Sequence, residues 1–200
     1  MKKTLILLAG FPGTGKTYLS HMIQKQVPFL EIVSPDDLKE EMWDQYGFDN
    51  LDQKNELIML AWEKYYKTLE EFFSSKVNVL SDYPFSNKQK EKLEKLCLDY
   101  EYQIITIRLI ADLEVLFERQ KKRDLDLTRH LGHIVKQYHK EDHLIKHDTA
   151  DNLLDHTEFM NRMLNRGYDK FTLGHLIEVD VTDFTKVDYD QIIKKIQSLL

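Results

Sequence analysis

The stretch from Gly10 to Thr17 reads GFPGTGKT and matches the phosphate-binding pattern G-x-x-x-x-G-K-[ST] at every fixed position. A short apolar run, residues 4–9, precedes it, and apolar residues at helical spacing follow it. In the order strand, glycine loop, helix, backbone N–H groups point inward at a phosphate and the helix N-terminus adds positive dipole. The pattern therefore predicts a nucleoside triphosphate site, with Lys16 on the outer phosphates and the Thr17 hydroxyl on a magnesium ion.

Composition and charge narrow the class of protein. The chain has 200 residues, of which 42% are hydrophobic, as is typical of one globular domain without a membrane span. Met1-Lys2-Lys3 leads directly into the first apolar run, so we expect no export signal. The single Cys97 is expected to be a buried, inert thiol, which fits a reducing, cytoplasmic location. The net charge of −6 argues against a broad surface for nucleic acid.

Short apolar segments alternate with amphipathic segments along the chain. Strands are expected at residues 4–9, 29–33, 77–82, 103–110 and 175–180, with helical spacing between them. This alternation predicts βαβ units and therefore a three-layer α/β fold of the P-loop NTPase type. We expect one domain over residues 1–200, with a five-stranded, mainly parallel sheet, helices on both faces and a helical lid. The lid and a helical insertion are expected at about residues 124–166.

Carboxylates follow two of the predicted strands. Ligands of parallel sheets collect at the carboxyl ends of the strands, so these residues are candidates for the site. Asp36, after the second strand, could accept the proton of an attacking hydroxyl, although Asp36 and Asp37 could equally stabilise a helix N-terminus. Asp82, after the third strand, could hold magnesium, or could be a turn residue ahead of Tyr83-Pro84.

Two arginines lie four residues apart in the helix expected after the fourth strand. Arg119 and Arg123 would therefore share one helix face. A guanidinium fork suits phosphate oxygens, and its plane can stack on a purine. Because Lys121 and Lys122 lie between them, a solvated basic face is the alternative interpretation.

In combination these motifs resemble the kinase domain of 5′-hydroxyl polynucleotide kinases and, more broadly, the small P-loop kinases of the zeta-toxin, chloramphenicol phosphotransferase and gluconate kinase groups. The resemblance is carried by residues 10–17, 34–39 (SPDDLK), 80–82 (LSD) and 116–123 (LFERQKKR), and extends to about residue 140. It implies that Asp36 is the general base, that Arg123 is a lid arginine on the transferring phosphate, and that Arg119 stacks on adenine. Lys39 falls where these kinases carry an arginine that grips a substrate phosphate, and a lysine lacks the bidentate fork.

The motifs and the resemblance together define the expected site. Catalytic roles are expected for Lys16, Asp36 and Arg123. The expected magnesium ligands are Thr17 and Asp82. The expected substrate contacts are Asp36, Lys39 and Arg129. The nucleotide is expected to contact Gly10, Phe11, Pro12, Gly13, Thr14, Gly15, Lys16, Thr17, Tyr18 and Arg119.

The expected function is ATP- and Mg²⁺-dependent transfer of the γ-phosphoryl group to a hydroxyl of a small molecule, nucleoside or nucleotide. One alternative is a 5′-hydroxyl polynucleotide kinase, and another is a nucleotide-driven binding module or switch with slow hydrolysis. Three observations favour a small acceptor over nucleic acid. They are the excess of acidic over basic residues, the lysine in place of arginine at position 39, and the lack of a D-x-D-G-T-like stretch. A switch would need no acceptor base such as Asp36.

Histidines concentrate in the expected insertion. Six of the eight lie between residues 124 and 156: His130, His133, His139, His143, His147 and His156. On a helix, His139, His143 and His147 would share a face that could bind a metal, but a solvated face beside the pocket is the stronger expectation. Arg129 and His130 are expected to belong to a mobile lid that closes over the triphosphate.

Overall fold

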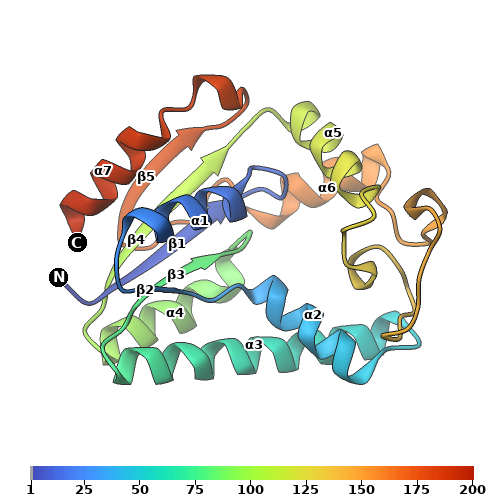
Figure 1. Ribbon diagram of the computed structural model, residues 1–200, viewed down its shortest axis with the longest axis horizontal. Helices are drawn as coiled ribbons and strands as arrows, with labels where there is room; N and C mark the ends of the chain where they lie inside the picture. Colours follow the sequence, from blue (N-terminus) through green and yellow to red (C-terminus); the bar gives the residue numbers. More distant parts are fainter. Residues whose placement is uncertain (1) are drawn as a thin grey trace.

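The computed structural model describes residues 2–200, which form one sheet of five parallel strands (Figure 1). The strand order across the sheet is β2-β3-β1-β4-β5. The strands are β1 (Thr4–Gly10), β2 (Leu30–Ile32), β3 (Asn78–Asp82), β4 (Gln103–Ile110) and β5 (His175–Asp180). The predicted α/β fold is therefore confirmed, and all the strand pairs are parallel.

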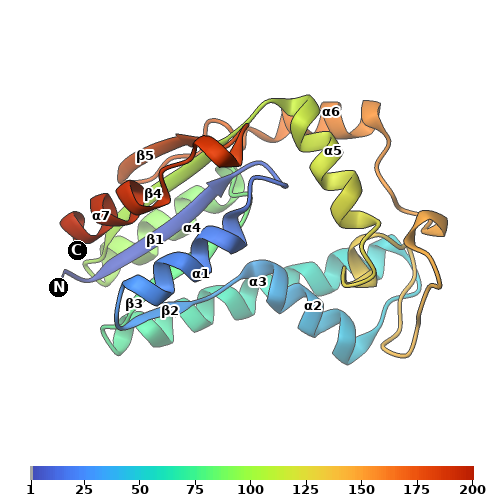
Figure 2. The same ribbon diagram turned by 45° about the horizontal axis from the view of Figure 1, so that its top comes forward.

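Helices cover both faces of the sheet. They are α1 (Lys16–Gln26), α2 (Pro35–Tyr46), α3 (Leu51–Ser74), α4 (Asn87–Asp99), α5 (Leu113–Asp124), α6 (His156–Arg166) and α7 (Tyr189–Leu199). Helices α1 and α7 lie on one face and α3 and α4 on the other (Figures 1 and 2). No helix within residues 2–200 combines the length and apolarity that crossing a bilayer requires.

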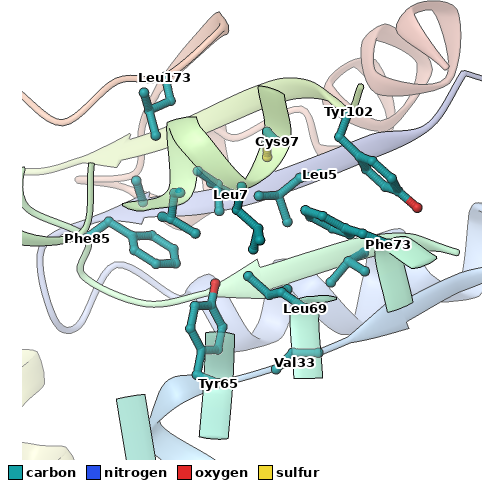
Figure 3. Close-up of a cluster of buried hydrophobic side chains, with 14 of the residues drawn as sticks. Leu5, Leu7, Val33, Tyr65, Leu69, Phe73, Phe85, Cys97, Tyr102 and Leu173 are labelled. Carbon is teal, nitrogen blue, oxygen red and sulfur yellow. The ribbon is translucent and has the colours of Figure 1, made fainter. Parts of the chain in front are cut away.

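Strand β1 separates two hydrophobic cores. Ile6 and Leu8 pack with Leu19 and Ile23 of α1 and with residues of α7. The alternate side chains, Leu5, Leu7 and Ala9, point to the opposite face, where Figure 3 shows Leu5 and Leu7 among the buried side chains of α3 and α4. Because both faces of β1 are buried, its sequence is continuously apolar rather than alternating.

The single cysteine lies in the second of these cores. Cys97, on α4, is buried in the same cluster as Leu5 and Phe73 (Figure 3). Burial raises the pKa of its thiol to about 12, so the thiolate does not form at neutral pH. Cys97 therefore behaves as a small apolar side chain, as the sequence predicted.

The segment after α5 differs from the expectation that residues 124–166 are helical. Residues 125–155 contain two short 3-10 turns, Leu131–His133 and His147–Thr149, and are otherwise irregular; the helix α6 begins only at His156. His139, His143 and His147 therefore do not share a helix face. In Figure 1 this segment, yellow to orange, runs from α5 back toward α2.

Hydrogen bonds within this segment, and to the loop after α2, explain why it is not a helix. Three aspartate side chains accept hydrogen bonds from backbone N–H groups of the segment, two of them from two or three residues away and the third across 15 positions, which gives the backbone an alternative to helical bonding. These pairs are Asp126 with Thr128, Asp142 with His139, and Asp151 with Lys136. In addition, Phe48 and Tyr138 exchange two backbone hydrogen bonds of 2.8 Å, which fix the segment to the loop between α2 and α3.

Candidate active site

The phosphate loop follows directly from the end of β1. Gly10 has φ +113°, and a Cβ there would lie 2.0 Å from the backbone oxygen of Leu109 on β4, so only glycine fits. The Thr14 hydroxyl donates to the Phe11 carbonyl at 2.8 Å and closes the loop. Gly15, in the left-handed conformation, leads into α1. The loop therefore has the backbone course that directs N–H groups at an anion.

Lys16 is buried at the centre of this loop. Its Nζ donates to the carbonyl oxygens of Phe11 at 2.7 Å and Gly10 at 3.2 Å. Burial and the nearby Arg123 lower the pKa of Lys16 to about 7, although Asp36 and Asp82 act in the opposite direction. Its ammonium therefore lies within electrostatic reach of Asp36 on α2, Asp82 on β3 and Arg123 on α5.

This lowered pKa predicts proton uptake when a nucleotide binds. A triphosphate beside Lys16 adds negative charge and raises the pKa of the ammonium above about 7. At about pH 8 we therefore expect uptake of about one proton per nucleotide, and a nucleotide affinity that falls as the pH rises above about 7. Calorimetry with a non-hydrolysable ATP analogue, in buffers of different ionisation enthalpy, measures this uptake. Lys16→Met should abolish it, and an uptake that survives in this variant would assign the proton to another group.

Thr17 and Asp82 bring two hard oxygen ligands together. The Thr17 hydroxyl donates to Asp82 Oδ2 at 2.7 Å, which joins the first turn of α1 to the end of β3. Burial raises the pKa of Asp82, so a nearby cation would favour its ionised form. No group of three or more His, Cys, Asp or Glu side chains suited to a metal occurs within residues 2–200. Two oxygen ligands nevertheless fit Mg²⁺, which keeps several waters and binds substrate phosphates.

Asp36 lies at the start of α2 and pairs with Lys39. Lys39 Nζ donates to Asp36 Oδ1 at 3.0 Å and to the Tyr83 hydroxyl at 2.9 Å, and lies 4.1 Å from the centroid of the Tyr83 ring. Burial alone would raise the pKa of Asp36, but Lys39, His133 and Arg129 outweigh it and hold this pKa well below the ordinary range. Asp36 is therefore a carboxylate at neutral pH. The ammonium of Lys39 is engaged here, and its contact with a substrate phosphate stays a prediction.

Asp37 has a different environment from its neighbour. It is exposed, has no ion-pair partner within residues 2–200, and lines the same cavity as Asp36. Burial and the carboxylates of Asp82 and Glu40 raise its pKa. Both aspartates therefore face the cavity, and only Asp36 is charge-paired.

Arg119 forms a flat wall at the other end of the loop. It donates to the carbonyl oxygens of Val181 at 2.9 Å and Thr182 at 2.8 Å, and its guanidinium lies 3.7 Å from the ring centroid of Phe184. A Cβ on Gly15 would lie 3.3 Å from the same ring, so Phe184 packs against the phosphate loop. Phe184 is not among the residues predicted from the sequence, although its position just after the fifth strand could have indicated it. Stacking of Arg119 on adenine stays a prediction.

One cavity of about 600 Å³ joins most of the predicted site residues. Those that line it are Pro12, Gly13, Gly15, Lys16, Thr17, Tyr18, Asp36, Asp82, Arg119, Arg123 and Arg129. Those that do not line it are the buried Gly10, Phe11, Thr14 and Lys39. Further lining residues, which were not predicted as site residues from the sequence, include Glu40, His133, Asn152, Arg162 and Phe184. Apart from Phe184, these come from α2, from α6 and from the irregular segment between α5 and α6.

Histidines attach this irregular segment to α2 and the loop that follows it. Three of them contact carboxylates: His130 with Asp44 at 2.9 Å, His133 with Glu40 at 2.6 Å, and His139 with Asp49 at 3.0 Å. The His133 ring is largely buried and packs edge-on against Trp43, with ring centroids 4.9 Å apart. These histidines therefore make contacts between segments far apart in the sequence.

The buried His133 predicts a loss of stability on acidification. Burial lowers its pKa from the ordinary 6.5, so protonation opposes folding and the free energy of unfolding falls as the pH drops below about 6.5. The pKa of Glu40 is also lowered, and it adds a loss only below about 4.5. Urea denaturation between about pH 7.5 and 5.5 measures this slope. His133→Gln should flatten it and the exposed His143→Gln should not; equal slopes in His133→Gln and wild type would contradict the prediction.

Three features define a P-loop nucleotide-binding fold of the α/β class. They are the order of the strands in the sheet, the glycine loop, and the cavity that Lys16 and Asp82 line together. The chain belongs to the AAA domain family, whose profile matches residues 5–138. This match ends close to the point, about residue 140, to which the predicted resemblance extends. No curated protein sequence matches the chain.

Solved structures share the fold over nearly the whole chain. A protein of Chloroflexus aurantiacus assigned as a kinase has a TM-score of 0.75 and 23% identity, covering 99% of this chain and 96% of that one. A sugar kinase from Janibacter sp. has a TM-score of 0.56 and 14% identity, with coverages of 98% and 92%. A chain of the Pnkp1/Rnl/Hen1 RNA repair complex has a TM-score of 0.57 and 15% identity, with coverages of 86% and 47%. The predicted resemblance to P-loop kinases is thus confirmed at the level of family and fold.

Proposed function

We propose that the protein is a kinase that transfers the γ-phosphoryl group of ATP to a hydroxyl of a small molecule. The observation that carries the proposal is that Asp36, held ionised by Lys39, lines the same cavity as Lys16 of the phosphate loop. Nucleotide binding alone requires the loop but not a second, charge-paired carboxylate facing it. Phosphoryl transfer to a hydroxyl uses such a group.

In this proposal the protein contributes charge and position. Lys16 and Arg123 stabilise negative charge on the transferring phosphoryl group, and the side chain of Arg123 has no hydrogen bond or ion pair within residues 2–200 that would compete. Thr17 and Asp82 would hold Mg²⁺, which neutralises charge on the phosphate oxygens when bound. Asp36 accepts a hydrogen bond from the acceptor hydroxyl. Because its pKa is low, Asp36 orients the hydroxyl throughout and takes its proton late, as a loose transition state requires.

The acceptor would lie on the side of the cavity away from Phe184. Glu40, His133 and Arg129 lie together there, since Glu40 contacts His133 at 2.6 Å and lies 4.0 Å from Arg129, and Arg162 on α6 lines the same cavity. It is bounded by the irregular segment that the histidines attach to α2. A bounded cavity of about 600 Å³ shared with a triphosphate suits a small acceptor better than a polymer.

A screen for acceptor-dependent ADP release tests the proposal. The panel contains sugars, amino sugars, nucleosides, nucleotides and 5′-hydroxyl oligonucleotides, each with Mg²⁺-ATP. Release that depends on a small acceptor and is lost in Asp36→Asn would support the proposal. Release that depends only on oligonucleotides would favour a polynucleotide kinase, and release that no acceptor changes would favour a nucleotide-driven switch.

A further inference from the structure

Arg129 is a largely buried arginine whose side chain makes no hydrogen bond within residues 2–200. The side chain is 14% exposed, and its Nε is fully enclosed without a partner. The nearest carboxylate oxygens are Asp124 Oδ1, 3.7 Å from Nε, and Glu40 Oε1, 4.0 Å from Nη1. Both lie beyond hydrogen-bond distance. Since a guanidinium carries five N–H donors, this is a costly arrangement unless something else accepts them.

The two neighbouring carboxylates are already engaged with other side chains. Both oxygens of Asp124 accept from Gln120 Nε2 at 2.7 Å, and Glu40 Oε1 contacts His133 Nε2 at 2.6 Å. They balance part of the charge of Arg129 without bonding to it. Arg119, in contrast, makes two hydrogen bonds to the backbone.

The backbone around Arg129 is fixed. Its N–H donates to the Asp126 carbonyl at 2.9 Å in a turn, and the next residue, His130, contacts Asp44 of α2. Arg129 therefore has a fixed backbone position on the wall of the cavity that it shares with Asp36. A second arginine, Arg162 of α6, lines the same cavity, and its side chain has no hydrogen bond or ion pair within residues 2–200.

We propose, as an extension of the proposed function, that the acceptor carries an oxyanion group, a phosphate or a carboxylate, which Arg129 binds on the Asp36 side of the cavity with Arg162 as a second contact. An oxyanion can accept two parallel N–H bonds from one guanidinium, which matches the unpartnered donors of Arg129. Lys39 cannot serve this role without leaving Asp36 and Tyr83. The acceptor is thus an anionic hydroxyl compound.

An equilibrium binding experiment tests the oxyanion site without turnover. With the phosphate loop saturated by Mg²⁺ and a non-hydrolysable ATP analogue, inorganic phosphate and acetate are titrated separately by calorimetry at constant ionic strength. We expect saturable binding of at least one of them, and the stronger one identifies the group as phosphate or carboxylate. Arg129→Gln should weaken it about tenfold or more, Arg129→Lys less, and the exposed Arg162→Gln by a smaller factor. Arg166→Gln, on the same helix but outside the cavity, should change nothing.

Three results would overturn the proposal. The first is the absence of binding to the wild-type protein, and the second is anion binding by a folded Arg129→Gln variant that is as strong as the binding by Arg162→Gln. The third comes from kinetics with any active acceptor: Arg129→Gln should raise the KM of the acceptor, and a rise in the KM of ATP alone would assign Arg129 to the triphosphate. Asp36→Asn should lose transfer but keep anion binding, so failure of the kinase proposal and failure of the oxyanion site can be told apart.

Discussion

Lys16→Met is expected to reduce phosphoryl transfer by about 10²–10³-fold or more while the fold stays intact. Methionine keeps the unbranched apolar stem of the buried side chain but removes the terminal ammonium, and with it the charge that lies at the phosphate loop. The outer phosphates then lose their principal cationic partner in the transition state. Acceptor-dependent ADP release measures the loss, and circular dichroism with thermal melting checks the fold.

A second lysine of the same helix provides the matched control. Lys25, in the last turn of α1, is exposed and lies outside the cavity. Lys25→Met should transfer phosphate at the wild-type rate. If Lys16→Met, natively folded, also kept the wild-type rate, the assignment of residues 10–17 as the phosphate loop of a kinase would be wrong.

Asp36→Asn is expected to keep ATP binding and to lose transfer by about 10²–10⁴-fold, the usual range for a positioned base. The amide of the introduced asparagine orients the acceptor hydroxyl less well than a carboxylate does, and it cannot accept the proton of that hydroxyl. The loss should appear in kcat rather than in the KM of ATP, because Asp36 is expected to act on the acceptor. Steady-state kinetics with the best acceptor of the screen separates the two parameters.

The buried partner of Asp36 calls for a control on stability. In Asp36→Asn, Lys39 keeps only the Tyr83 hydroxyl as a partner, and an uncompensated buried charge is destabilising. The double variant Asp36→Asn with Lys39→Met removes both charges and should recover stability but not activity. A double variant that recovered activity would show that the single variant had failed through misfolding.

A comparison of Asp37→Asn with Asp36→Asn shows which of the two carboxylates acts on the acceptor. Asp37 lines the same cavity, but it lacks a cationic partner and its pKa is raised. Asp37→Asn should therefore cost far less activity than Asp36→Asn. If the two variants behaved in the reverse way, Asp37 would be the acceptor base and Asp36 a structural partner of Lys39.

The sequence by itself determined the phosphate loop and the alternation of strands and helices. Both depend on local patterns: the glycines at fixed spacing in residues 10–17 and continuous apolar runs such as that of β1. The candidate carboxylates Asp36 and Asp82 followed from the same patterns, since strand ends of a parallel sheet meet at one edge. A local sequence pattern is sufficient to predict a feature when that feature is formed by contacts between residues close in sequence.

Only the tertiary structure decided what surrounds these carboxylates. Lys39 meets Tyr83 across 44 positions of sequence, and His133 meets Glu40 across 93, so no local spacing indicates either pair. The irregular course of residues 125–155 depends, besides the aspartate hydrogen bonds within the segment, on contacts with α2 and the loop that follows it, which compete with the helix that its polar composition favoured. Arg129 lies on the cavity wall because of that course. Its buried, unpartnered guanidinium results from packing between segments that are distant in sequence. No local sequence pattern indicates such packing.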